Sequence, residues 1–254
     1  MQAVTVTPKF VFGVNGQLNN SLHIHEEKKL VYVAGHNVIV YDLEEGTQQF
    51  IPGSANADEI NYIAMSPSGR LVALCERAQP RSQVTIFDVP TRQRKKTLPE
   101  FEMENLPFEC KEFLSCAFSP VDEKHNLVTL CGEGDWCVIM WQWDTFKMLS
   151  KFDLNVVSPS ETKTFQISMA QIMQDQVIVV TGSKTFSYLK LEENMRSIVQ
   201  VHGELDTRQA SDEYTCHTWA KDSVQLVIGT AEGEILVANM RGEFVICVPT
   251  SPFG

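Results

Sequence analysis

The stretch that decides the fold reads AMSPSGRLVAL and spans Ala64–Leu74, and it recurs as AFSPVDEKHNLVTL at Ala117–Leu130. In both copies an apolar run ends at Ser-Pro, and a second apolar run follows after a few polar residues. Proline lacks the N–H that a strand ladder needs, so it ends the first run as a strand, and serine and glycine beside it favour a turn. A weaker copy, TWAKDSVQLVIG, spans Thr218–Gly229. Each copy is therefore predicted to be a β-hairpin.

A second element recurs downstream of the hairpin, where an apolar run ends in an aromatic residue followed by aspartate. Its three copies are Tyr41-Asp42, Phe87-Asp88 and Trp143-Asp144. The hairpin and this ending together divide the chain into units of four short strands, over residues 15–54, 55–99, 112–153, 163–203 and 212–249. Repeated four-stranded units with an aromatic-Asp ending are typical of a WD40-type β-propeller. An ordinary β-sandwich is the alternative, but a sandwich does not require the same motifs at matched offsets.

The number of units bears on whether the ring is closed. Five four-stranded blades account for the chain, and residues 3–12 form an extra strand that could close a ring. A seven-bladed ring at this repeat length would need roughly 300 to 350 residues. The all-β fold is therefore expected to be an incomplete seven-bladed propeller. A gap or a partner is expected between residues 3–12 and the fifth unit.

Composition excludes several other classes of protein. The 254 residues carry 21 Lys and Arg against 32 Asp and Glu, for a net charge of −11, and 43% of the residues are hydrophobic. The chain is too apolar to be disordered, and its acidic surplus argues against a nucleic-acid partner. Its apolar runs are far shorter than the roughly 20 residues that a membrane helix needs. The seven cysteines form no CxxC pair. This pattern indicates buried thiols in a reducing compartment and no zinc site. No secretory signal opens the chain, so the cytoplasm is the expected compartment.

The chain also resembles a known family in its short motifs. From the start of the chain onward these are Phe12-Gly13, Asn19-Asn20, Gly35-His36-Asn37, FIPGS at Phe50–Ser54 and SCAFSP at Ser115–Pro120. Their order and spacing are similar to the opening of the cilia- and flagella-associated protein 57 family. Those proteins are large WD-repeat proteins of motile cilia.

The resemblance implies a non-enzymatic scaffold of the ciliary or flagellar axoneme. Family members carry two tandem propellers and a long coiled coil, and they help to dock or regulate inner dynein arms on doublet microtubules. The resemblance thus implies axonemal protein partners and a cytoskeletal location. It implies no cofactor, no membrane partner and no small-molecule substrate. This sequence stops at Gly254, before a second propeller or a coiled coil.

Two other functions are alternatives to the scaffold. A cytosolic WD40 adaptor in a non-ciliary complex would share the fold but not the location. A propeller enzyme would place acidic or histidine ligands from several blades around its channel, and the first strands show no repeated acidic position. His23 and His25 alternate on one strand but lack a third metal ligand. No GxSxG or HExxH motif is present, so no catalytic or metal-binding residue is predicted.

One basic run breaks the acidic pattern of the chain. It consists of Arg92, Arg94, Lys95 and Lys96 and falls on the fourth strand of the second unit, which is the outer edge of a blade. Charged residues on an edge strand protect it against pairing with other chains. The functional interpretation is a contact with an acidic partner, such as an acidic tubulin tail. Either interpretation fits the sequence.

The tryptophans indicate how the blades are held together. Trp143 and Trp219 are expected to fill the space between blades. The His, Ser or Thr, Asp and Trp set that links strands in regular WD40 repeats is mostly missing. The blades are therefore expected to rely on apolar packing.

Overall fold

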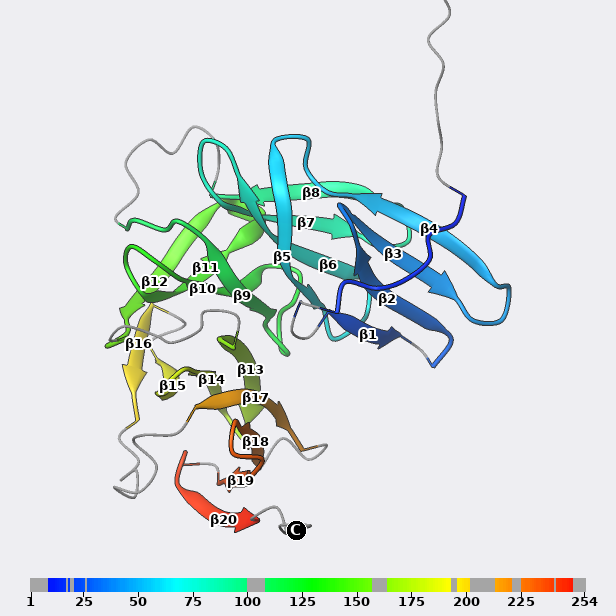
Figure 1. Cartoon of the computed structure of the whole chain (residues 1–254). Coiled ribbons are helices and arrows are strands. Elements are labelled where there is room, and N and C mark those ends of the chain that lie inside the picture. Colours follow the sequence, from blue (N-terminus) through cyan, green and yellow to red (C-terminus); the bar gives the residue numbers. More distant parts are fainter. Residues whose placement is uncertain are drawn as a thin grey trace, which may run out of the picture.

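The computed structural model describes residues 9–16, 18, 21–25, 27–99, 108–156, 164–192, 196–201, 213–220, 225–239 and 241–248. These residues form five antiparallel sheets of four strands, and within each sheet the strands lie side by side in chain order (Figure 1). The prediction of an all-β propeller architecture with five four-stranded blades is confirmed. In the part of the chain that the structure describes, no helix has the length and apolarity that crossing a membrane requires.

Each blade is one of these sheets, numbered here in chain order. Blade 1 contains β1 (Leu22–His25), β2 (Lys29–Ala34), β3 (Asn37–Asp42) and β4 (Thr47–Pro52). Blade 2 contains β5 (Ala57–Met65), β6 (Leu71–Ala78), β7 (Gln83–Asp88) and β8 (Gln93–Leu98). Blade 3 contains β9 (Phe113–Phe118), β10 (Asn126–Cys131), β11 (Cys137–Gln142) and β12 (Lys147–Asp153).

The last two blades follow the same plan. Blade 4 contains β13 (Gln166–Ile172), β14 (Asp175–Gly182), β15 (Thr185–Glu192) and β16 (Ser197–Gln200). Blade 5 contains β17 (Tyr214–Trp219), β18 (Leu226–Thr230), β19 (Ile235–Ala238) and β20 (Phe244–Val248). A short 3-10 helix, η1 (Trp143–Thr145), lies in the β11–β12 connection.

The repeated Ser-Pro hairpin has a hydrogen-bonded basis in the β5–β6 turn. The Ser66 hydroxyl accepts a hydrogen bond from the Leu71 N–H at 3.0 Å, and the Gly69 N–H donates to the Ser66 carbonyl at 2.8 Å. Gly69 has a φ of 69°, and a Cβ there would overlap the ring of His25. The turn therefore needs both a short hydroxyl side chain before the proline and a glycine after it.

The aromatic-Asp ending closes the next turn of the blade. In blade 1 the Asp42 carboxylate accepts hydrogen bonds from the backbone N–H groups of Glu44 and Glu45 at 3.0 and 2.9 Å. The Glu45 hydrogen bond is the largest cause that lowers the pKa of Asp42 below its ordinary value. In this blade the charged aspartate therefore organises the turn between the third and fourth strands, whereas Asp144 of blade 3 has a buried Oδ1 without a hydrogen-bond partner among the described residues.

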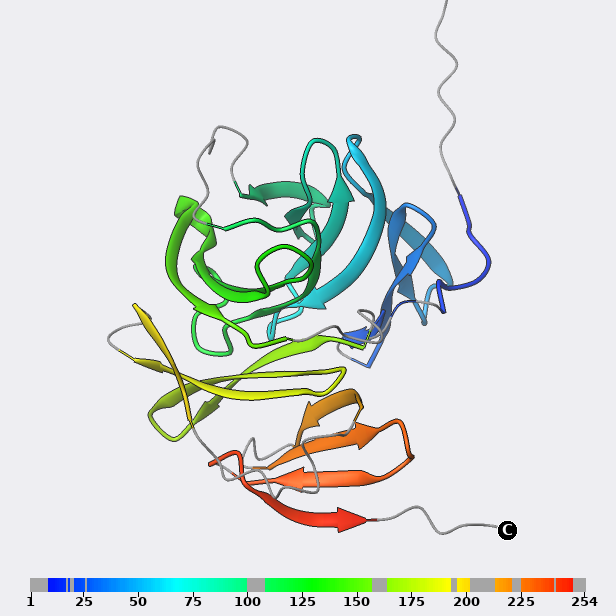
Figure 2. The ribbon, with the colours of Figure 1, turned by 60° about the vertical axis from the view of Figure 1, so that its left-hand side comes forward.

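Apolar clusters join each blade to the next. One cluster contains residues of blades 1 and 2, and others join blades 2 and 3, 3 and 4, and 4 and 5. Among the described residues no such cluster combines blade 5 with blade 1. Figure 2 shows the five sheets following one another from blue to red, with the red sheet beyond blade 4. That seven blades make up a complete ring stays a prediction.

The expected closing strand at residues 3–12 falls mostly on residues 3–8, which lie outside the described part. The described end of this segment, Lys9–Phe12, is not a strand. Val11 instead pairs with a side chain of β4, because its N–H donates to Gln48 Oε1 at 2.7 Å and its carbonyl accepts from Gln48 Nε2 at 3.0 Å. This segment thus contacts the face of blade 1 that points away from blade 2.

Hydrogen bonds of tryptophan supplement the apolar packing. Trp143 is buried in the cluster of blades 2 and 3, as expected, and its Nε1 donates to the Glu123 carbonyl at 3.0 Å. Trp141, which the repeat pattern did not single out, is fully buried and donates from Nε1 to Thr129 Oγ1 at 2.9 Å. A tryptophan on the third strand of blade 3 is therefore bonded to a threonine on its second strand.

A polar chain of four side chains crosses between blades 4 and 5. Its centre is His217, which is buried, with Nε2 lying 2.6 Å from Ser168 Oγ and Nδ1 lying 2.7 Å from Thr181 Oγ1. Trp219 is only partly buried beside this junction, and its Nε1 donates to Ser168 Oγ at 3.0 Å. At this junction a buried polar chain thus adds to the apolar packing that the sequence led us to expect.

Candidate functional site: a basic groove on blade 2

Three of the four predicted basic residues line one groove on the outer side of blade 2. The groove has a volume of about 530 Å³. Its lining residues are Asn56, Gln79, Pro80, Arg81, Gln83, Arg94, Lys95, Lys96, Thr97, Pro99 and Phe146. Arg92, the fourth predicted residue, lies in the β7–β8 turn and is not part of this lining. We call this site the basic groove.

The basic groove follows β8, which is the edge strand of its sheet. Arg94 and Lys95 are exposed, whereas Leu98 at the other end of the strand is fully buried. Ile86 of β7 pairs with Lys96 and Phe87 pairs with Arg94, so Lys95 is the extra residue of a β-bulge. Bulges and lysines both protect an edge strand against pairing with another strand. The protective interpretation of the basic run and its exposure to a partner are therefore compatible.

The β7–β8 turn that presents the strand is held by Asp88. Its buried carboxylate accepts hydrogen bonds from the N–H and hydroxyl of Thr91 at 3.1 and 2.7 Å and from Arg70 Nε at 3.0 Å. Burial alone would raise the pKa of Asp88, but these hydrogen bonds outweigh it and lower the pKa below its ordinary value. Arg92 closes the turn with a positive φ of 58°. The turn is therefore fixed by a charged aspartate.

An aromatic ring of blade 3 forms one wall of the basic groove. Phe146 follows η1 and adopts a left-handed backbone conformation with a φ of 57°. Lys96 Nζ lies 4.0 Å from the centroid of its ring, which is a cation–π contact. Lys96 is thereby positioned, whereas Arg94 and Lys95 have no ion pair with another described residue. These two side chains are available to an anionic ligand.

The floor of the groove leads into a buried polar network centred on Glu76. Gln83 is buried and accepts a hydrogen bond from Asn56 Nδ2 at 3.2 Å while its Nε2 donates to Glu76 Oε2 at 3.0 Å. The fully buried Glu76 carboxylate also accepts from Thr85 Oγ1 at 2.6 Å and from both the N–H and hydroxyl of Ser54 at 2.7 Å. A buried carboxylate needs several donors to offset the cost of desolvation, and Glu76 has four.

Two of the motifs that carry the family resemblance meet at this network. The FIPGS motif supplies Gly53 and Ser54, and the Gly-His-Asn motif supplies His36. His36 Nε2 lies 3.0 Å from the Ser54 carbonyl oxygen, and a Cβ on Gly53 would lie 2.7 Å from the same nitrogen. The glycine therefore makes room for the histidine, and the serine reaches Glu76. The motifs alone do not indicate that they support a common site.

The lining of the basic groove carries a surplus of positive charge. Its cations come from Arg81, Arg94, Lys95 and Lys96, and the negative charge below its floor is the hydrogen-bonded Glu76. Within the described residues no group of three or more His, Cys, Asp and Glu side chains is arranged to hold a metal ion. His23, one of the two alternating histidines, lies with Nε2 3.3 Å from the Ile63 carbonyl oxygen.

Curated proteins of similar sequence include two cilia- and flagella-associated proteins. The chain is 28% identical over 295 aligned residues to cilia- and flagella-associated protein 57 C of Tetrahymena thermophila, covering 96% of this chain and 22% of that protein. It is 26% identical over 257 aligned residues to cilia- and flagella-associated protein 57 of Mus musculus, covering 99% of this chain and 19% of that protein. The resemblance to the cilia- and flagella-associated protein 57 family is confirmed. The chain spans about a fifth of the length of these curated relatives.

Comparison of structures supports the fold independently. The crystal structure of the RRP9 WD40 repeats matches with a TM-score of 0.63 at 13% sequence identity, covering 92% of this chain and 64% of that one. At this identity the match shows the WD40 propeller fold alone. A comparison with models of protein families finds no match.

Proposed function

We propose that this chain is a WD-repeat scaffold of the axoneme of motile cilia and flagella and has no enzymatic role. Its similarity over nearly the whole chain to two cilia- and flagella-associated proteins 57 carries the proposal. The finer role proposed is docking or regulation of inner dynein arms on doublet microtubules, with axonemal proteins as partners. Propellers present loops and edge strands on a rigid framework, which suits this role.

Within this role we assign the basic groove to an acidic segment of a partner, for instance an acidic tubulin tail. Arg94 and Lys95 supply free cations, and the Phe146 ring and two prolines supply apolar walls beside them. On a protein of net charge −11 a local group of cations favours one orientation of an acidic partner. Arg92 adds to this positive field from the neighbouring turn.

The location is tested with the protein in ciliated cells. A tagged protein should lie along the axoneme, and crosslinking mass spectrometry of isolated axonemes should recover doublet or dynein-arm components. A diffuse cytosolic protein that crosslinks to a trafficking or ubiquitin-ligase complex would contradict the proposal.

The groove is tested with a double variant, Arg94→Glu/Lys95→Glu, which leaves the packed Lys96 in place. Its binding to taxol-stabilised microtubules should fall at least about fivefold at low ionic strength, because two exposed contacts become repulsive. The control Lys184→Glu/Arg241→Glu changes the net charge equally at exposed positions of other blades. Equal losses in both variants would show a general charge effect and contradict the assignment.

A further inference from the structure

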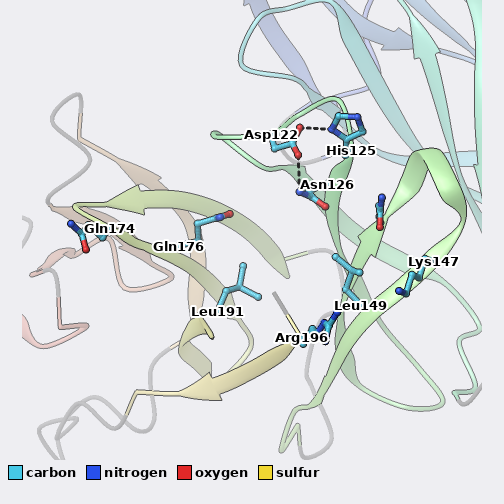
Figure 3. A pocket seen from close by; sticks show the side chains of 10 residues that line it. Asp122, His125, Asn126, Lys147, Leu149, Gln174, Gln176, Leu191 and Arg196 are labelled. Atoms are coloured by element: carbon cyan, nitrogen blue, oxygen red, sulfur yellow. Dashed lines mark hydrogen bonds and ion pairs between the residues drawn. The ribbon is translucent and has the colours of Figure 1, made fainter. Parts of the chain in front are cut away.

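A second groove, between blades 3 and 4, has a different character. It has a volume of about 630 Å³, which is within the range of ligand sites. Figure 3 shows Asp122, His125 and Asn126 at one end, Lys147 and Leu149 along blade 3, and Gln174, Gln176 and Leu191 on the blade 4 side. Arg196 and Gln142 complete the lining. We call this site the amide groove.

The turns of two neighbouring blades build the amide groove. Blade 3 contributes the β9–β10 turn, the start of β10 and both strands that flank η1. Blade 4 contributes the β13–β14 turn, the start of β14, the end of β15 and Arg196, which directly precedes β16. Phe146 lines the basic groove whereas its neighbour Lys147 lines the amide groove. One connection, β11–β12, therefore separates the two sites.

The charges of the amide groove are unbalanced. The single acid of its lining, Asp122, is already engaged, because Oδ1 lies 2.8 Å from His125 Nδ1 and Oδ2 accepts from Asn126 Nδ2 at 3.2 Å (Figure 3). Neither Lys147 nor Arg196 has an ion pair with another described residue. Two cations therefore face a groove whose one carboxylate already has hydrogen-bond partners on both oxygens, which favours an incoming carboxylate.

The remaining polar groups match a peptide backbone. Gln142 and Gln174 present side-chain amides that make no hydrogen bond within the described residues, and each amide offers both a donor and an acceptor. Gln176 uses its Oε1 to accept from Ser119 Oγ at 3.3 Å, so its NH₂ group stays available. An extended peptide offers donors and acceptors along its length. Small anions do not need such a row of amides.

The apolar part of the lining also argues against a nucleotide. Leu149 and Leu191 form the base and pack on the shared cluster of blades 3 and 4. The described residues of this lining include no Phe, Tyr or Trp on which a nucleobase could stack. We propose that the amide groove binds an extended segment of a partner protein that carries Asp or Glu side chains. The site is distinct from the basic groove and extends the proposed scaffold function.

Fluorescence anisotropy with a labelled peptide tests the proposal directly. The probe alternates glutamate with serine and threonine, and its counterpart has glutamine at each glutamate. The glutamate probe should bind, and the glutamine counterpart should bind at least about fivefold more weakly. In Lys147→Glu/Arg196→Glu the affinity for the glutamate probe should fall by a similar factor. The control Lys184→Glu/Arg241→Glu should stay within about twofold of the unmodified protein.

Two further measurements distinguish a peptide in this groove from a peptide in the basic groove and from a small anion. Gln174→Ala removes an amide without changing charge and should weaken the probe at least about twofold, because a hydrogen bond to the peptide is lost. An unchanged affinity in Lys147→Glu/Arg196→Glu, with a loss in Arg94→Glu/Lys95→Glu instead, would place the peptide in the basic groove and overturn the proposal. Free glutamate or inorganic phosphate could also compete with the probe. An inhibition constant equal to the dissociation constant of the probe would overturn the proposal, since the site would then bind a small anion.

Discussion

His217 in blade 5 and Ser168 in blade 4 lie 2.6 Å apart, from imidazole Nε2 to hydroxyl Oγ. Thr181 Oγ1 lies 2.7 Å from the other ring nitrogen, so both nitrogens of this buried histidine have a hydroxyl partner. Neither partner carries a compensating negative charge. Desolvation therefore lowers the pKa of His217 to about 3, and the junction of blades 4 and 5 is built around a neutral ring.

This neutral histidine predicts loss of stability in mild acid. The unfolded chain binds a proton on His217 near pH 6.5, whereas the folded chain does not bind it until about pH 3. The contribution of His217 to the free energy of unfolding should therefore be complete above pH 6.5. It should fall as the pH drops toward 3, by up to about 1.4 kcal/mol per pH unit. Urea unfolding between pH 7 and 5 measures this slope. His217→Asn should be less stable at pH 7 and show a flatter slope, and an equal slope in both proteins would contradict the assignment.

The hydrogen-bond network of Glu76 predicts a large loss of stability when this buried residue is replaced. Glu76→Ala leaves the donors of Ser54, Gln83 and Thr85 without their shared acceptor. The free energy of unfolding should fall by at least about 2 kcal/mol. Glu59→Ala is the matched control, because Glu59 forms an exposed pair with Arg77 and should cost less than about 1 kcal/mol. Comparable losses in chemical unfolding would show that the network contributes little.

The Gly53 position of the FIPGS motif is predicted not to tolerate a side chain. Gly53→Ala would place a methyl group against His36 and displace the ring from the Ser54 carbonyl. A loss of about 1 to 2 kcal/mol is expected, from the strain and the lost hydrogen bond. Gly16→Ala is the control, because a Cβ there meets no atom within 4 Å. Thermal unfolding of the two variants provides the comparison, and a Gly53→Ala protein as stable as the control would refute the steric argument.

The two tryptophans expected between blades should differ in how much stability the protein loses when each is replaced by alanine. Trp143 is buried, with 6% of its surface exposed, so Trp143→Ala should destabilise the protein by about 3 to 5 kcal/mol. Trp219 is only partly buried beside its cluster, and Trp219→Ala should cost less. Equilibrium unfolding by denaturant measures both, and the reverse order would mean that the junction of blades 4 and 5 dominates stability.

The repeat could be predicted from sequence because its signals are local. The Ser66 and Gly69 turn and the Asp42 and Asp88 turns each depend on residues within a few positions of one another. Their hydrogen bonds leave a fixed pattern of residue types along the chain. The edge position of β8 was predictable for the same reason, since it follows from counting strands within one unit.

The polar networks could not be predicted because their partners are distant in sequence. Glu76 lies in β6 directly before the exposed Arg77, and all four of its hydrogen bonds come from Ser54, Gln83 and Thr85, which lie in other segments. His217 does not occupy the position expected in a regular WD40 repeat, and its partners belong to the preceding blade. The continuation of the apolar run of β6 directly into a charged residue is the signal that could have indicated Glu76.

Neither groove could be assembled from the sequence alone. Phe146 reaches the basic run of blade 2 from the β11–β12 connection, and Arg196 and Lys147 line one groove from two different blades. These contacts between residues of different blades depend on how far each sheet is rotated relative to its neighbour. Sequence patterns within one unit contain no information about that rotation.

The chain of shared apolar clusters has a mechanical consequence. Blades 2, 3 and 4 each share apolar clusters with two neighbours, whereas the described residues of blades 1 and 5 each share a cluster with one neighbour. Ile246 and Val248 are half exposed on the outer strand of blade 5. In a row of units coupled only to their neighbours, opening proceeds from the unit with the fewest couplings. Hydrogen exchange should therefore be faster in blades 1 and 5 than in the three blades between them. A partner that covers the face of blade 5 would slow exchange of the backbone amides as far back as the strands around His217.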